Sequence, residues 1–258
     1  MKTKGLVIIA LCLGLAYCAS SSQAKLDKQK AKDPHYQYNL GLLYLNNPSA
    51  GTMSLDQAIA CFDKSIALNP KYYLAWNAKG LTLIMKGDQE GAVKSFQKCL
   101  EINPGFSEAH NNLGSLYESQ GMTSLAEDEY KKALADESYP SKELPFYNLA
   151  RMSYGLGKYD DALSYVHKSL QISGRFAMSH NLKGMIFEKL GLPQDAIASY
   201  EMAVKIVPDD MNFQFNLALA CLNAGDKDKA ADIFTLILNK TTDSELRAKV
   251  VDYRKKIK

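Results

Sequence analysis

The chain's histidines and cysteines are the residues best suited to metal binding or nucleophilic chemistry. Its 258 residues include 4 His and 5 Cys, and His110 and His180 lie 70 residues apart. No His/Cys group has the close spacing of a metal site, and no glycine-rich phosphate loop or G-x-S-x-G nucleophile motif is present. The sequence therefore predicts no catalytic site, no metal and no cofactor, and it favours a protein that is not an enzyme.

The cysteines divide into two groups by position. Cys12 and Cys18 belong to the N-terminal segment, whereas Cys61, Cys99 and Cys221 fall on helix-packing positions of a repeat described below. We expect these three to be buried, unreactive thiols. A Cys61–Cys99 bridge is the alternative, because export would place the chain in an oxidising compartment.

Six alanines recur at spacings of 34, 34, 36, 34 and 34 residues. A period near 34 is typical of stacked helical hairpins. A large apolar or aromatic residue follows most of the alanines by four positions, and Gly or Ala precedes most of them by twelve. The pattern predicts two antiparallel helices per unit, which cross closely at the small residue and the alanine. The alanines are Ala58, Ala92, Ala126, Ala162, Ala196 and Ala230.

Glycines and prolines mark the expected helix ends. A glycine lies between the two helices of five units, where a left-handed helix cap would use it. Prolines follow three of the alanines by twelve residues and are expected to end the second helix. These residues are Gly87, Gly121, Gly157, Gly191 and Gly225, with Pro70, Pro104 and Pro208.

Trp76, Gly80, Ala92, Phe96 and Pro104 resemble the tetratricopeptide pattern W-x2-[LG]-G-x2-Y…A-x3-F…P. The resemblance implies an all-α fold, a right-handed α-solenoid of about six repeats over residues 34–243. The repeats are expected at 34–72, 73–106, 107–142, 143–176, 177–210 and 211–243. Residues 244–258 carry a helical stripe of Leu246, Val250, Tyr253 and Ile257 and are expected to form a capping helix.

The N-terminus reads as an export signal. Residues 1–17 combine a basic start with a short apolar run, and Leu15-Ala16-Tyr17-Cys18 resembles a bacterial lipobox. The resemblance implies a lipidated Cys18 and a flexible tether over 18–33, on a protein that is anchored in the outer membrane and faces the periplasm. Tyr17 departs from the usual small residue, and cleavage after Ala24 would instead release a soluble periplasmic protein.

Charge excludes some partners. The 31 basic and 28 acidic residues nearly balance, and no basic stripe is present, so nucleic acid is not an expected ligand. No later segment has the ~20 apolar residues of a membrane span.

The first helices are expected to line a concave groove that binds a protein partner, with no small-molecule substrate. Asparagine amides can donate to and accept from a peptide backbone; alternatively, these amides bond neighbouring helices. Some tetratricopeptide domains hold a carboxylate with Lys and Arg in the groove. This groove contains one basic residue, Arg151, which argues against such a clamp. The apolar N-terminal end of the groove favours a hydrophobic partner segment. The predicted groove residues are Tyr38, Leu42, Leu74, Asn77, Leu81, Asn111, Tyr147, Arg151, Asn181, Met185 and Phe215.

The stretch 126–150, with Leu-Ala-Glu-x-Glu-Tyr and Tyr-Pro…Tyr-Asn-Leu, is similar to the type IV pilus biogenesis/stability lipoproteins, the PilF/PilW pilotin family. The resemblance implies a scaffold that binds a secretin subunit and assists its localisation and multimerisation at the outer membrane. The alternative is a periplasmic tetratricopeptide adaptor for another client, such as a cell-wall hydrolase or protease. The sequence leaves the client, the binding surface and the oligomeric state open.

Overall fold

The computed structural model describes residues 29–46 and 51–255, and over these ranges the chain forms 13 helices and no strand. The all-α repeat fold is confirmed. The predicted signal peptide, Cys18, most of the tether and Ile257 lie outside the described residues. The helices are α2 (Pro34–Leu45), α3 (Gly51–Leu68), α4 (Tyr73–Lys86), α5 (Gln89–Ile102), α6 (Ser107–Ser119), α7 (Thr123–Ala133), α8 (Glu143–Gly155), α9 (Tyr159–Ile172), α10 (Ala177–Lys189), α11 (Pro193–Ile206), α12 (Met211–Asn223), α13 (Lys227–Lys240) and α14 (Ser244–Lys255).

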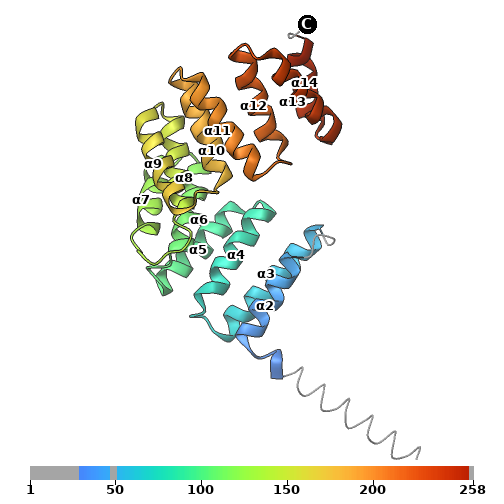
Figure 1. The fold of residues 1–258 in the computed structure, drawn as a ribbon. Coiled ribbons are helices and arrows are strands. Elements are labelled where there is room, and N and C mark those ends of the chain that lie inside the picture. The colour runs from blue at the N-terminus through green and yellow to red at the C-terminus, as the bar shows by residue number, and fades with distance from the viewer. Residues whose placement is uncertain (1–28, 47–50, 256–258) are drawn as a thin grey trace, which may run out of the picture. The chain divides into compact units, whose positions relative to one another are not determined.

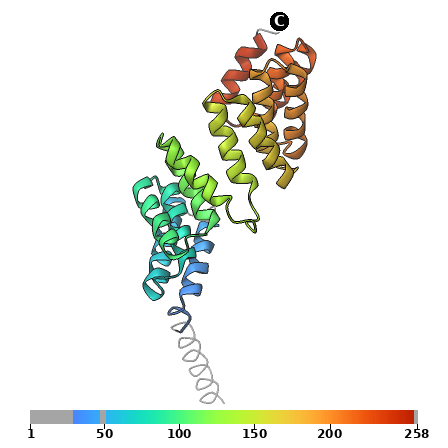
Figure 2. The ribbon, with the colours of Figure 1, turned by 90° about the vertical axis from the view of Figure 1, so that its left-hand side faces the viewer.

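The chain divides into two compact units, which meet in sequence between Leu116 and Tyr117. In the first unit, α2 packs on α3, α3 on α4, and α4 on α5. In the second unit each helix from α7 to α14 packs on the next one. Neighbouring helices therefore form antiparallel pairs within each unit (Figures 1 and 2). The predicted third repeat, residues 107–142, contains the division.

Helix ends follow the expected local chemistry. All five predicted turn glycines have positive φ, from 72° at Gly191 to 90° at Gly225, where a side chain would be strained. Three second helices, α3, α5 and α11, end at Leu68, Ile102 and Ile206, two residues before a proline. The turns therefore end the helices at the places that the sequence predicts.

Three helix pairs cross with a ring pressed against a glycine. A Cβ atom added at Gly80 would lie 2.6 Å from the Phe96 ring, and Phe96 is fully buried. Gly41 and Phe62, and Gly184 and Tyr200, repeat this contact. The sequence analysis identified the close crossing. The structure adds that, in these three repeats, the aromatic residue covers the small residue of its own pair.

Tyrosine replaces phenylalanine at this position where a carboxylate is within reach. The Tyr130 hydroxyl donates to Glu118 at 2.7 Å, and the Tyr200 hydroxyl donates to Glu188 at 3.0 Å. Each glutamate lies twelve residues before its tyrosine, whereas Phe96 has Ile84 at that place. A buried hydroxyl needs a hydrogen-bond partner. Tyrosine therefore occurs at this position in the two repeats that have a glutamate twelve residues earlier.

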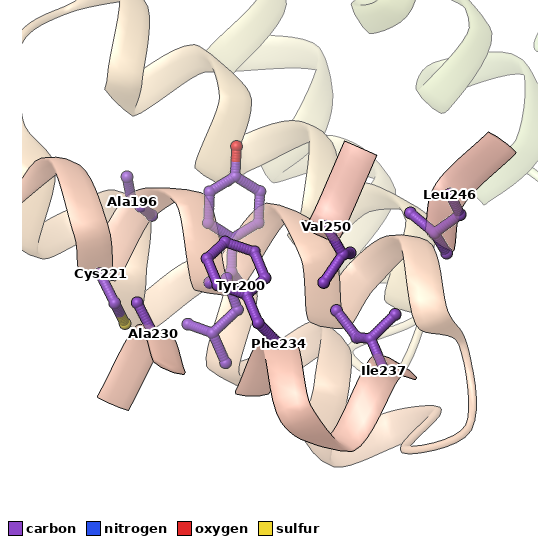
Figure 3. Packing of buried hydrophobic residues seen from close by; sticks show 11 residues of the cluster. Ala196, Tyr200, Cys221, Ala230, Phe234, Ile237, Leu246 and Val250 are labelled. Carbon is purple, nitrogen blue, oxygen red and sulfur yellow. The ribbon is translucent and has the colours of Figure 1, made fainter. Parts of the chain in front are cut away.

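The last helix covers the end of the core. On α14, Leu246 and Val250 are buried in one cluster with Phe234 and Ile237 (Figure 3). The Tyr253 ring stacks on Phe234, with centroids 6.3 Å apart and planes at 20°. The predicted cap is therefore a packed helix along the stripe Leu246, Val250 and Tyr253, in keeping with terminal repeats that need a covering element.

We predict that Gly80→Ala lowers the free energy of unfolding by about 1–3 kcal/mol, because the buried Phe96 ring has no free space into which to move. This cost should exceed the gain of about 1 kcal/mol in helix propensity that alanine brings. Urea unfolding followed by far-ultraviolet circular dichroism measures the difference.

Gly155→Ala is the matched control, since Gly155 is also helical and a Cβ atom there meets nothing within 4 Å. It should be neutral or slightly stabilising. The double variant Gly80→Ala/Phe96→Val copies the natural pair Ala150 and Val166 and should be more stable than the sum of its single variants predicts. Equal effects of the two glycine substitutions would contradict the tight crossing.

Candidate functional site

All predicted groove residues lie on the first helix of their pair. Their exposure differs along the chain: Asn77 and Asn111 are buried, Leu81 and Arg151 are exposed, and the others are partly buried. The first unit contributes its residues from α2, α4 and α6, and the second unit contributes its residues from α8, α10 and α12. The structure therefore defines two groups of groove residues, one in each unit.

The first group is mainly apolar. Tyr38 on α2 lies against Tyr72 and Phe62, with ring centroids 5.3 Å and 6.0 Å apart. Burial is the main cause that raises the pKa of the Tyr38 hydroxyl. On α4, Leu81 is 39% exposed and Ile84 is 37% exposed. This surface offers aliphatic contacts to a ligand, and the Glu108 charge also raises the pKa of the Tyr38 hydroxyl.

The asparagines bond between neighbouring first helices. The Asn112 side-chain amide donates to the Asn77 oxygen at 3.2 Å, and the Asn216 amide donates to Asn181 at 2.8 Å. Both bonds join residues 35 positions apart, so they link successive repeats. For Asn77 and Asn181 the structure therefore shows the alternative use of these amides, which is to bond neighbouring helices.

Arg151 is part of a charged contact inside the second unit. Its guanidinium donates to Glu118 at 2.9 Å, and Glu118 also accepts the Tyr130 hydroxyl. The carboxylate thus balances the predicted groove's one basic side chain. Nearby, burial raises the pKa of the Tyr147 hydroxyl, and the Arg151 charge opposes this shift.

The C-terminal end of the predicted groove is partly covered by the cap. Phe215 on α12 lies edge-on to Tyr253 of α14, with centroids 5.8 Å apart, and tilted against Phe234 at 6.2 Å. Met185 on α10 receives the Asn181 amide at its sulfur, 3.8 Å away. Phe215 therefore has a packing role that the sequence analysis did not assign.

A hydrogen bond recurs at the tryptophan position of the repeat, and the sequence analysis did not predict it. In five repeats a side-chain nitrogen at this position contacts the carbonyl oxygen six residues earlier. A signal was present in the sequence, because all five side chains carry an N–H group. The contacts are Gln37 to Ala31 at 2.9 Å, Trp76 to Pro70 at 3.1 Å, His110 to Pro104 at 2.8 Å, His180 to Gly174 at 3.0 Å and Gln214 to Pro208 at 3.0 Å.

These bonds give His110 and His180 a structural role. Each ring nitrogen Nε2 faces a carbonyl oxygen, so the tautomer that carries the proton on Nε2 donates to it. Phe146 has no N–H group, and there the Lys168 ammonium lies 5.8 Å from the ring centroid. In the part of the chain that the structure describes, no group of three His, Cys, Asp or Glu could hold a metal ion.

The three repeat cysteines are free and buried. Burial raises the pKa of the Cys99 thiol to about 12, and it also raises the pKa values of Cys61 and Cys221. The expected burial of the three thiols is observed, and the structure contains no Cys61–Cys99 bridge. Among the described helices, none combines the length and apolar character needed to cross a bilayer.

Comparison with known proteins agrees with the repeat pattern. Tetratricopeptide-repeat models match residues 61–94, 80–121, 147–210 and 181–244. The chain therefore contains tetratricopeptide repeats, which act as protein-interaction scaffolds. A relative from Methanocaldococcus jannaschii, the TPR repeat-containing protein MJ1428, is 28% identical over 70% of this chain, and the matched region spans 33% of that protein's length.

Two solved structures share the fold over most of the chain. PilW, a widely conserved type IV pilus biogenesis factor, has a TM-score of 0.74 at 20% identity and covers 84% of this chain and 98% of its own. Pseudomonas aeruginosa PilF has a TM-score of 0.73 at 18% identity and covers 88% of this chain and 99% of its own. At these identities the similarity is one of fold.

We predict that N-ethylmaleimide at pH 8 leaves Cys61, Cys99 and Cys221 unmodified in the folded protein. The thiolate is the reactive form, and burial favours the protonated thiol. All three should react after unfolding in guanidinium chloride without reductant, as peptide mass mapping would measure.

A Cys61–Cys99 disulfide would show the opposite result, with both residues protected after unfolding until a reductant is added.

The raised pKa of Cys99 also predicts how the free energy of unfolding depends on pH. The folded state holds the Cys99 proton more tightly than the unfolded state. The contribution of this difference to the free energy of unfolding is fully present at neutral pH. It declines as pH rises above about 8.5, the ordinary thiol value.

Proposed function

We propose that this chain is an outer-membrane lipoprotein that binds a secretin subunit in the periplasm and assists secretin assembly in type IV pilus biogenesis. The observation that carries the proposal is the fold shared with PilW and PilF, over 84% and 88% of this chain and 98% and 99% of theirs. The lipobox-like sequence ending at Cys18 supports the membrane anchor. Acyl chains on Cys18 would hold the scaffold at the inner leaflet.

The apolar surface of the first unit is the proposed contact for the secretin segment. Leu81 and Ile84 expose aliphatic side chains on α4, and Tyr38 and Leu42 extend this surface along α2. A hydrophobic segment laid on these residues would lose apolar area to water at both partners, which favours association. No bond is made or broken, so contact free energy and membrane partition drive the assembly.

A periplasmic adaptor for another client is the second candidate. Tyr17 before Cys18, and the Ser22-Gln23-Ala24 sequence further on, favour cleavage to a soluble form. Both candidates use the same repeat scaffold, so the client and the anchor distinguish them.

We predict that deleting the gene in its native host removes heat-resistant secretin multimers from the outer-membrane fraction. A wild-type copy should restore them, whereas Cys18→Ala should not, because the scaffold would lose its lipid. Immunoblots of gels that preserve the multimers provide the measurement. Multimers that persist in the deletion strain would overturn the secretin proposal, and restoration by Cys18→Ala would overturn the anchor.

We further predict that Leu81→Glu abolishes restoration while the protein accumulates at wild-type levels. A carboxylate on the apolar surface must be desolvated when the partner binds. Leu68→Glu is the matched control, since Leu68 on α3 is 43% exposed and Leu81 is 39% exposed. If both variants restore multimers equally well, the secretin segment binds elsewhere on the scaffold.

A further inference from the structure

One contact between neighbouring repeats holds two basic side chains in the second unit where the first unit has an ion pair. In the first unit the Lys79 ammonium on α4 donates to the Asp63 carboxylate on α3 at 2.6 Å. Asp63 lies five residues after its repeat alanine, and Lys79 lies one residue before its crossing glycine. The same two repeat positions hold His167 on α9 and Lys183 on α10. The second contact therefore keeps the lysine and lacks the carboxylate.

A second lysine beside this contact also lacks the carboxylate that its equivalent has. Lys132 on α7 pairs with Glu129, three residues earlier on its own helix. Lys168 on α9 has the same repeat position, and the residue three places before it is Tyr165. The Lys168 ammonium lies 5.4 Å from the centroid of the Tyr165 ring and 5.8 Å from that of Phe146. Aromatic rings thus replace the counter-charge.

The other lysine is held in the same way, with its ammonium 5.5 Å from the centroid of the Phe187 ring. A ring face attracts an ammonium group, and the three N–H donors of that group allow it to bind an anion as well. We call His167, Lys168 and Lys183 the basic cluster. The first two are exposed and the third is partly buried. In the part of the chain that the structure describes, none of the three forms an ion pair.

The charged groups around His167 reinforce this picture. Burial, and then the Lys183 charge facing it from α10, lower the pKa of His167. On α9 itself Lys168 is adjacent, while Asp160 and Asp161 lie in the first turn, about 10 Å away along the helix axis. The remaining titratable or charged side chains of the three helices are Glu143 and Arg151 on α8 and His180, Glu188 and Lys189 on α10. None of these carboxylates pairs with the basic cluster, so its charge is open to an anion from outside.

We propose that the basic cluster binds an acidic segment of a protein partner. An Asp or Glu carboxylate of that segment meets Lys183 as Asp63 meets Lys79 in the first unit. Charge complementarity favours an anion here, and the equivalent contacts within this chain use carboxylates, which favours an acidic peptide over a phosphate. The rings beside the two lysines add apolar contact for the stem of the acidic side chain.

This surface differs from the predicted groove. Lys183 lies two residues from both Asn181 and Met185 on α10, and residues two apart on a helix do not share a face. The basic cluster also belongs to the second unit, whereas the proposed secretin contact belongs to the first unit. The two proposals can therefore fail independently.

The test uses N-acetyl-Asp-Gly-Asp-amide as the probe and the nitrogen-15 labelled full-length chain. The probe should shift the amide resonances of His167 and Lys183 saturably, with a dissociation constant on the order of millimolar for so small a ligand. It should also raise the pKa of His167, because a nearby carboxylate favours the imidazolium. N-acetyl-Asn-Gly-Asn-amide has the same backbone without the charges and should give no saturable shift.

His167→Asp copies the first unit, so the new carboxylate should pair with Lys183 as Asp63 pairs with Lys79, and binding of the probe should be lost. Lys183→Gln should weaken binding by about two- to fivefold. His167→Gln introduces no charge and should keep most of the binding, which separates the loss of the imidazole from the gain of a carboxylate. Lys79→Gln is the matched control, because that lysine is already paired, and it should bind the probe as the wild type does. Far-ultraviolet circular dichroism should show that all four variants fold.

The proposal is overturned by any of three results: no saturable shift with the acidic probe, an equal response to the asparagine probe, or an unchanged response in His167→Asp. Phosphatidylglycerol vesicles test a membrane as the source of the anion. If they shift the same resonances and the acidic peptide does not, the assignment to a protein segment is wrong. Sedimentation tests a second copy, and a dimer that His167→Asp removes would show that the chain supplies its own acidic segment and would overturn the assignment to a different protein.

Discussion

The close contact between a small residue on the first helix and a buried side chain on the second is the constraint on which the hairpins depend, and in three of them it joins a glycine and a ring. At Gly80 and Phe96 the added Cβ atom would lie only 2.6 Å from the ring, so the helix axes approach as closely as the backbone allows. Interiors are packed without spare volume, so a larger residue at one place can be matched by a smaller one at the other, as in Ala150 with Val166. The sixth repeat instead packs Ala218 and Phe234 in one buried cluster.

The carbonyl bonds made at the tryptophan position extend this constraint from one hairpin to the next. His110, for example, bonds Pro104, which follows the end of the preceding second helix. A carbonyl near a helix end has no partner within its helix, and the side-chain donor supplies one. The Asn216–Asn181 bond links successive first helices in the same way. Hydrogen bonds of side chains thus fix how neighbouring hairpins join within a unit.

These structural uses limit what is left for a ligand. Arg151 is balanced by Glu118, Phe215 is packed by Tyr253, and the asparagine pairs bond one another. The apolar residues of the first unit remain the surface best able to accept a partner. They offer burial of apolar area as the main driving force, which suits a protein-interaction scaffold.

The sequence by itself determined the helices, their turns and their pairing, because the 34-residue period, the turn glycines and the prolines act through local geometry. It also identified the first helices and the buried cysteines. Only the tertiary structure decided which asparagines bond each other and where His110 and His180 donate. These outcomes depend on distances between side chains that lie in different helices, and residue type and spacing do not specify such distances.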